Sequence, residues 1–308
     1  MNAVELRALW KKYGRRPALR GIDLTLPDYQ IIGVVGPDGA GKTTLIRTLA
    51  GLLTIEASEA RVLGHDLRGD VTDLKAEVGY VPQVFSLQRE LSVIENLRFT
   101  ARLYRIPRRI FDERADELLA RTGLAAFVDR PAGALSGGMK QKLAVINALL
   151  PGPKLVLLDE PTAGVDVTSR AEIWTMLESA REEALVVIST SYLDEAETCD
   201  RLVYLEDGRV VAEGSPAELR GRVPLELYRA WNDDPRRLAR AARRLPYVEG
   251  ARQTGIFTRI EVVRDRSPGL LQIERDLHAL AEPPVHLVER LPIDMEAMLL
   301  HFARGIDP

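Results

Sequence analysis

The sequence IIGVVGPDGAGKTTLIRTLA, residues 31–50, decides the fold. Residues 31–35 are apolar or small and predict a short strand. A glycine-rich turn follows at 36–44, and residues 43–50 have the apolar spacing of a helix that ends at Gly51. A strand, a tight turn and a helix in that order indicate an α/β protein built on a parallel sheet.

The turn fits the pattern of a phosphate-binding loop. Its glycines let successive backbone N–H groups face a β-phosphate at a helix N-terminus, which already favours anions. Lys42 is placed to reach the β- and γ-phosphates, and the Thr43 hydroxyl to ligate Mg²⁺. The alternative is a turn that binds nothing, and the flanking strand and helix disfavour it. The nucleotide-binding residues predicted from this loop are Gly36, Pro37, Asp38, Gly39, Ala40, Gly41, Lys42, Thr43 and Thr44.

A second element is LVLLDEP at residues 155–161. An apolar strand that ends in Asp159 places a carboxylate at the carboxyl edge of the sheet, where ligands collect in open α/β folds. We expect Asp159 to hold Mg²⁺, commonly through water, and Glu160 to polarise the attacking water. An acidic pair at a strand end is often only a solvated turn, but its combination with the phosphate loop favours the catalytic interpretation.

The third element is LSGGMKQ at residues 135–141, which opens a helix that we expect to run to about residue 150. Ser136 is a natural N-cap, and Gly137 and Gly138 expose further N–H groups, so the segment predicts a second anion site. An ordinary capped helix is the alternative. Because the chain then has two helix N-termini suited to bind phosphate, we favour the interpretation that residues 135–141 bind an anion.

Length and composition exclude several classes of protein. The chain has 308 residues, 46% hydrophobic and 28% charged, which excludes a disordered or fibrous protein. The formal net charge is 42 − 45 = −3, so no nucleic-acid partner is expected. No signal segment is visible and no apolar run approaches the roughly 20 residues of a membrane helix, so we expect a cytoplasmic location. The single cysteine, Cys199, excludes an intramolecular disulfide.

The pattern of the chain changes along its length. Helical periodicity dominates residues 84–134, and continuous apolar strands return at 155–158 and 185–188. A hairpin is expected at 202–205 and 209–212. Beyond a boundary near residue 222, residues 223–308 predict a small α+β domain of ferredoxin-like βαββαβ order. Its expected elements are a strand at 225–230, a helix at 235–244, a hairpin of 247–253 and 256–263, a helix at 268–280, a strand at 284–288 and a closing helix at 295–303.

Together, these motifs resemble those of the ATP-binding-cassette (ABC) ATPases. Residues 36–43 resemble their Walker A motif, residues 157–160 their Walker B motif and residues 135–141 their signature sequence. The resemblance covers about residues 4–220, in the order of the family.

The resemblance implies the architecture as well. It implies a P-loop NTPase cassette at 1–222, with a mixed sheet core and a helical subdomain at 84–134. The domain at 223–308 is similar to the C-terminal extension of the ATPases of ABC-2 type exporters.

Three further residues match the family's pattern one by one. Gln83, in VGYVPQ, corresponds to the Q-loop glutamine, so the resemblance implies a catalytic role for it and a place among the Mg²⁺ ligands. Asp166, in AGVDVTSR, corresponds to the D-loop aspartate, and Tyr13, in KKYG, to the aromatic residue that stacks on adenine. A surface amide and a packed surface aromatic are the alternative interpretations of Gln83 and Tyr13.

The resemblance implies a head-to-tail pair of cassettes with two ATP molecules between them. Each nucleotide lies on the Walker motifs of one cassette, and the signature sequence of the other covers it. The residues agree with this arrangement, because a lone phosphate loop leaves the γ-phosphate facing solvent and the Ser136 helix start cannot fold back over its own ATP. The implied cofactors are ATP and Mg²⁺, the catalytic residues are Glu160, Lys42, Gln83 and Ser191, and the metal ligands are Thr43, Gln83 and Asp159.

The chain departs from the family where a histidine usually contacts the γ-phosphate. The segment 187–197 otherwise matches, and Ser191 occupies the histidine position. Serine reaches less far than histidine and cannot become cationic. Since losing one preorganised donor typically slows a reaction by about 10²–10³-fold, we expect good ATP binding but slow hydrolysis. The alternative is that Ser191 suffices, through a water molecule.

The serine has a consequence for assembly. A homodimer would carry two impaired sites, whereas a heterodimer with a histidine-bearing cassette keeps one active site. We therefore favour the heterodimer. The sequence also resembles the first half of tandem-cassette ABC-2 exporters, whose second half carries the histidine.

The function predicted from the sequence is that of the ATP-binding subunit of a membrane exporter. We expect it to work with a second cassette and a separate polytopic permease, on the cytoplasmic face of the cell membrane. The helical region, hinged at Gln83, is expected to pass the cassette's movement to the permease. Two alternatives stay open: a soluble ABC ATPase that acts on ribosomes or DNA, and a regulatory ATP-binding module with little turnover, which Ser191 favours.

Overall fold

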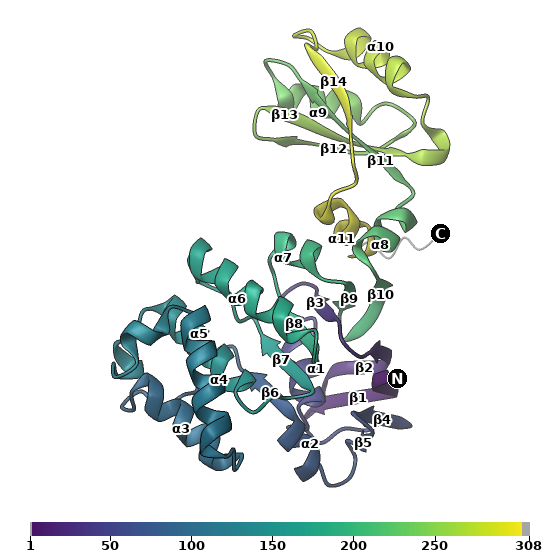
Figure 1. Ribbon diagram of the computed structural model, residues 1–308. Coiled ribbons are helices and arrows are strands. Elements are labelled where there is room, and N and C mark those ends of the chain that lie inside the picture. The colour runs from purple at the N-terminus through teal and green to yellow at the C-terminus, as the bar shows by residue number, and fades with distance from the viewer. Residues whose placement is uncertain (1, 304–308) are drawn as a thin grey trace. The chain divides into compact units, whose positions relative to one another are not determined.

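The computed structural model describes residues 2–303 and divides the chain into two compact units. The first unit ends at Pro216 and the second begins at Ala217. The boundary that we expected near residue 222 lies after this division, at the end of helix α8 (Pro216–Arg222), and stays a prediction. Figure 1 shows the helices and strands of each unit.

A six-stranded sheet forms the centre of the first unit. Its order is β10-β9-β3-β8-β7-β6, parallel except for β10, which pairs antiparallel with β9. Every residue of the central strands β3, β7 and β8 is buried, which explains their continuous apolar sequences. The predicted strands and the predicted hairpin are thus confirmed. The bounds are β3 Ile31–Val35, β6 Val78–Val81, β7 Leu155–Asp159, β8 Leu185–Ser189, β9 Arg201–Glu206 and β10 Arg209–Gly214.

A second, antiparallel sheet packs against helix α1 (Lys42–Leu49) in one apolar core. Its strand order is β2-β1-β4-β5. This core contains Leu6 and Leu24 of the second sheet and Leu45 of the helix. It also contains Val34 and Leu157 of the central sheet. The sequence predicted only the middle of β2 and missed the other strands and α2. The bounds are β1 Asn2–Tyr13, β2 Arg16–Pro27, β4 Glu59–Val62, β5 His65–Asp66 and α2 Thr72–Glu77.

The helical region predicted at 84–134 is helical only from Val93 onward. Residues 84–91 form bends and irregular backbone, and the capping box of Ser92 and Glu95 marks where the helix begins. The helices here are α3 Val93–Leu103, α4 Arg108–Arg121, the short η1 Leu124–Phe127 and η2 Ala132–Ala134, and α5 Gly137–Leu149. Two further helices follow, α6 Val167–Ala180 and α7 Leu193–Thr198.

The second unit has the predicted βαββαβ order. Its four strands form an antiparallel sheet in the order β12-β13-β11-β14. Tyr228 and Ile260 of this sheet share a core with Leu238 of α9 and Leu277 of α10. The assignment to the ferredoxin-like class stays a prediction. The bounds are β11 Leu225–Trp231, α9 Pro235–Ala242, β12 Val248–Thr254, β13 Phe257–Val263, η3 Arg264–Arg266, α10 Leu270–Leu280, β14 Leu287–Leu291 and α11 Met295–Ala303.

Within residues 2–303, no helix combines the length and the apolar character that crossing a bilayer requires.

Substituting Ser92 with alanine tests the start of α3. Ser92 Oγ accepts a hydrogen bond from Glu95 N at 3.3 Å, and Glu95 Oε2 accepts one from Ser92 N at 2.8 Å. Ser92→Ala should lower the free energy of unfolding by about 1 kcal/mol in urea titrations. Ser92→Thr should keep most of the stability that the cap provides, because threonine also has a hydroxyl that can accept the hydrogen bond. An alanine variant as stable as the parent would contradict the assigned cap.

The cap should also respond to pH. The Ser92 backbone N–H, followed by its side chain, holds the pKa of Glu95 below its ordinary value. The contribution of the Glu95 carboxylate is therefore present at neutral pH and is lost as the pH falls through the pKa of folded Glu95.

Candidate active site

The phosphate loop leaves β3 at its carboxyl end and closes against β9. Gly36 has a φ of 149°, and a Cβ on it would lie 2.0 Å from the carbonyl oxygen of Leu205. Gly41, with a φ of 108°, is the N-cap of α1 and offers no side chain to bond the first N–H groups of that helix. The first turn of α1 also holds no acidic residue. The loop therefore presents free backbone donors and a positive helix end, as an anion requires.

Lys42 is folded into this loop. Its Nζ donates to the carbonyl oxygens of Gly36, at 2.8 Å, and Pro37, at 3.3 Å. The residue is only 6% exposed, and Nζ lies 3.8 Å from Glu160 Oε1. The ammonium group is therefore held within the loop, 3.8 Å from one carboxylate oxygen each of Glu160 and Asp38.

The carboxylate of Asp159 joins three elements. Its Oδ1 accepts hydrogen bonds from Thr43 Oγ1 and Ser189 Oγ, each at 2.9 Å. Asp159 is fully buried, and its Oδ2 has no hydrogen-bond partner among the described residues. A buried, unpartnered carboxylate oxygen is costly unless a cation balances it. Oxygen donors from Asp159 and Thr43 beside a phosphate loop fit Mg²⁺, which prefers few protein ligands together with phosphate and water.

Glu160 adopts a backbone conformation that is uncommon for its residue type. Its φ is 50°, and its N–H is shared between the carbonyl oxygen of Ser189, at 3.2 Å, and Ser189 Oγ, at 3.0 Å. Such left-handed residues concentrate at functional sites, where the surrounding structure holds them. In this conformation the carboxylate lies near the loop lysine, with Oε1 3.8 Å from Lys42 Nζ.

Two predicted residues meet at the Glu160 carboxylate. Gln83 Nε2 donates to Glu160 Oε2 at 3.1 Å, and Ser191 Oγ donates to Glu160 Oε1 at 3.2 Å. Gln83 follows β6 and Ser191 follows β8, the two strands that flank β7, so their carboxyl ends bring both residues to Glu160 at the end of β7. The structure thus gathers Lys42, Gln83 and Ser191 around Glu160, and their catalytic roles stay predictions.

The signature segment lies against the start of α6. Ser136 caps α5 and accepts a hydrogen bond from Met139 N at 3.3 Å. Gly138 packs so closely on α6 that a Cβ would lie 2.5 Å from Ser169 Oγ. Asp166 caps α6 through a bond from Ser169 N at 2.9 Å, and this backbone N–H lowers the pKa of Asp166. Signature and D-loop residues therefore form one surface.

This surface is not bonded to the phosphate loop. Among the residues that the structure describes, no hydrogen bond or ion pair links the signature residues 136–138 to residues 36–44. Tyr13, at the end of β1, is 49% exposed, with Lys11 Nζ 5.3 Å from its ring centroid. Its role beside adenine stays a prediction.

Ser189 is a site residue that the sequence analysis missed. Its hydroxyl is fully buried and touches both acidic residues of the site. The signal would have been strand alignment, because Asp159 and Ser189 are register partners in adjacent parallel strands. A lone serine after four apolar residues does not reveal that register.

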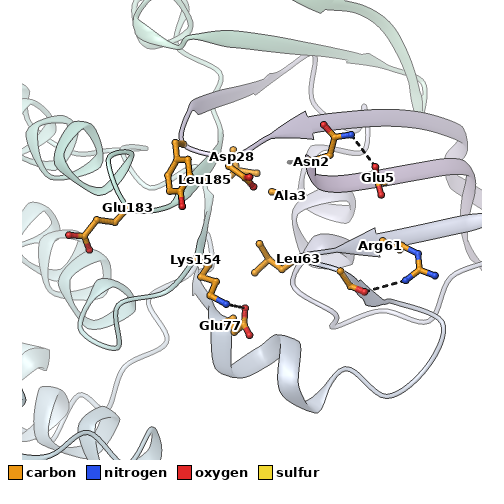
Figure 2. A pocket seen from close by; sticks show the side chains of 12 residues that line it. Asn2, Ala3, Glu5, Asp28, Arg61, Leu63, Glu77, Lys154, Glu183 and Leu185 are labelled. Carbon is orange, nitrogen blue, oxygen red and sulfur yellow. Dashed lines mark hydrogen bonds and ion pairs between the residues drawn. The ribbon is translucent and has the colours of Figure 1, made fainter.

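A cavity of about 380 Å³ lies at the amino ends of the parallel strands of the central sheet. Its lining includes Glu77 and Lys154, which precede β6 and β7, and Leu185 at the start of β8 (Figure 2). Lys154 Nζ pairs with Glu77 Oε2 at 3.0 Å. The phosphate loop follows the carboxyl end of β3, so this cavity lies at the opposite end of the parallel strands.

Comparison with known proteins identifies the family of the chain. The family profile described as "ABC transporter" matches residues 19–163, which contain the phosphate loop, the signature segment and both acidic residues. The daunorubicin/doxorubicin resistance ATP-binding protein DrrA of Streptomyces peucetius is 34% identical over 288 residues, which are 91% of this chain and 84% of that protein.

Another relative is longer than this chain. The probable multidrug ABC transporter ATP-binding protein YbhF of Escherichia coli (strain K12) is 38% identical over 280 residues, 90% of this chain but 48% of that protein. The chain therefore spans about half the length of this relative.

A solved structure shows the same fold. The dimeric structure of a post-hydrolysis state of the ATP-binding cassette MJ0796, bound to ADP and Pi, is 26% identical, with a TM-score of 0.63, and covers 69% of this chain and 98% of that chain. The chain belongs to the family of ABC transporter ATP-binding proteins. The predicted resemblance, cassette fold and ABC ATPase class are confirmed, and the roles of individual site residues stay predictions.

Replacing Gly36 with alanine tests the contact that holds the loop. The added Cβ cannot remain 2.0 Å from the Leu205 carbonyl oxygen, so the loop must move away from β9. We expect ATP affinity to fall by at least about tenfold, which corresponds to about 1.4 kcal/mol, in titrations with a fluorescent ATP analogue. Gly221→Ala is the control, because no atom lies within 4 Å of its added Cβ. Unchanged affinity in Gly36→Ala would refute the assigned loop geometry.

Proposed function

We propose that this chain is the ATP-binding subunit of an ABC exporter. The observation that carries the proposal is the cluster of Lys42, Thr43, Asp159 and Glu160 at the free N-terminus of α1. It offers backbone donors for phosphates, an unpartnered carboxylate oxygen for a cation and a second carboxylate for water. Two relatives are named for multidrug transport and for drug resistance, which supports export as the process that ATP drives.

The proposed chemistry divides among the residues of this site. Thr43 and Asp159 would hold Mg²⁺ with oxygen atoms. The amide nitrogen of Gln83 donates a hydrogen bond to Glu160. The amide oxygen of Gln83 therefore remains available to coordinate Mg²⁺. Mg²⁺ supplies charge neutralisation on the phosphates. Glu160 accepts hydrogen bonds and is placed to orient and polarise the attacking water.

The working unit that we propose is a pair of cassettes. The phosphate side of the site is complete in this chain, whereas the capping side, formed by Ser136, Gly138 and Asp166, lies on a separate surface. A partner cassette would bring the equivalent surface over the γ-phosphate. The related cassette MJ0796 has a solved structure whose title calls it dimeric and bound to ADP and Pi, which is compatible with such a pair.

Ser191 favours an asymmetric pair. Its hydroxyl already donates to Glu160 at 3.2 Å, and a neutral hydroxyl at this position brings no positive charge to the γ-phosphate. We therefore infer that this site binds ATP and turns it over slowly. A heterodimer with a histidine-bearing cassette keeps one fast site. The same observation favours the second candidate function, a regulatory ATP-binding module with little turnover.

The helical region supports docking to a permease. Val84, directly after Gln83, is 74% exposed, and Phe99 and Leu103 on α3 are 54% and 69% exposed. Phe99 and Leu103 are four residues apart and so share one face of α3, and neighbouring exposed apolar side chains favour a partner. We infer that a separate membrane permease contacts this region, and that this contact holds the chain at the cytoplasmic face of the membrane.

Introducing the missing histidine tests the proposal. Ser191→His should raise the rate of ATP hydrolysis by about tenfold or more, because it returns a donor able to carry charge at the γ-phosphate. Phosphate release assays with the full chain, alone and with a second cassette, measure this rate. Ser58→His on the exposed surface is the matched control, and Glu160→Gln should abolish turnover in either background. A rate that Ser191→His leaves unchanged would exclude the slow-site proposal.

A further inference from the structure

The segment that carries Ser191 is short and lies between two regular elements. Residues 190–192 connect β8 to α7. A serine hydroxyl is only one bond beyond Cβ, so its place depends on how the backbone around it is held. The 3.2 Å contact from Ser191 Oγ to Glu160 Oε1 therefore needs a support outside Ser191 itself.

Glu195, on α7, supports the segment from one side. Its carboxylate is 2% exposed, and its Oε2 accepts a hydrogen bond of 2.5 Å from Thr190 Oγ1. Thr190 Oγ1 in turn accepts a bond of 3.0 Å from Tyr192 N. Thr190 is thus bonded directly to the buried carboxylate, and Tyr192 is linked to it through the Thr190 hydroxyl. Such a carboxylate requires a positive partner.

Arg170, on α6, supplies that partner. Its Nε lies 3.6 Å from Glu195 Oε1, and in the described part of the chain neither atom has a hydrogen bond of its own. Its guanidinium carbon is 4.1 Å from the centroid of the Tyr192 ring, a cation–π distance. Its Nη1 lies 3.4 Å from Asp194 Oδ2. One guanidinium therefore contacts three residues that follow Ser191.

The same arginine is tied to the proposed dimer surface. Arg170 N donates to the carbonyl oxygen of Asp166 at 2.9 Å, so it lies one helical turn after the D-loop residue. Gly138 of the signature segment also approaches this turn, since a Cβ on it would lie 2.9 Å from Asp166 Oδ2. A shift of Asp166 along the axis of α6 carries Arg170 with it.

We propose that Arg170 is a positioning residue for Ser191. Together with Tyr192, Asp194 and Glu195 it forms a clamp, here called the Arg170 clamp, that holds residues 190–192 against α6. A partner cassette would bind at Asp166. When it displaces Asp166, the clamp transmits that displacement to the Ser191 hydroxyl, which contacts Glu160. This inference rests on the proposed function for the part that Ser191 plays in turnover.

Amide hydrogen exchange tests the clamp without any catalysis. In the full chain, Arg170→Met should speed exchange of the amides at 190–196 by about tenfold or more, because the buried Glu195 loses its counter-charge. Arg181→Met is the matched control, since Arg181 follows the same helix and pairs with Asp200 at 3.1 Å. Unchanged exchange at 190–196 in Arg170→Met would overturn the proposal.

A double-mutant cycle tests the link to Ser191. Arg170→Met alone should lower kcat by about tenfold with KM unchanged, whereas in a Ser191→Ala background it should change kcat by less than about twofold. Equal losses in both backgrounds would mean a merely structural role and would overturn the proposal. If Arg170→Met does not fold, Tyr192→Leu removes the ring contact without leaving a buried charge. A chain with no turnover at all would defeat the proposed function, while the exchange result still decides the clamp.

Discussion

The site depends on one buried carboxylate, that of Asp159. Its Oδ1 receives the hydroxyl of Thr43, which opens α1, and the hydroxyl of Ser189, which ends β8. A single oxygen atom therefore fixes the phosphate loop to two neighbouring strands. Its second oxygen has no hydrogen-bond partner among the described residues. A cation bound there would offset the free-energy cost of burying this charged oxygen. The carboxylate that orders the loop is therefore also the one that would hold the proposed Mg²⁺.

The residues around Glu160 and the signature residues lie on separate parts of the first unit. Lys42, Gln83 and Ser191 approach the Glu160 carboxylate from the loop and from two strand ends. The signature and D-loop residues instead form a surface of their own, on the paired helix starts of α5 and α6. In the proposed pair, the second cassette would cover the γ-phosphate, and Arg170 would pass the movement of that partner to Ser191.

The sequence predicted the features that local pattern determines, and missed those that depend on distant pairing. The strand at 31–35, the glycine loop and the strand ending at Asp159 are each readable from a few consecutive residues. Strands β1 and β4 were missed because Val4 pairs with Val62, far along the chain, and neither segment alone has a strong pattern. Ser189 was missed for the same reason, since its function follows from the register with Asp159.

The central claim is that ATP is hydrolysed only where two cassettes meet. The most direct measurement is turnover per chain across a wide range of protein concentration, with the mass determined by sedimentation in the same samples. The account predicts that turnover per chain falls on dilution as pairs dissociate, and rises when a histidine-bearing cassette is added. A protein that stays monomeric with ATP at every concentration, and hydrolyses it at an undiminished rate, would contradict the account.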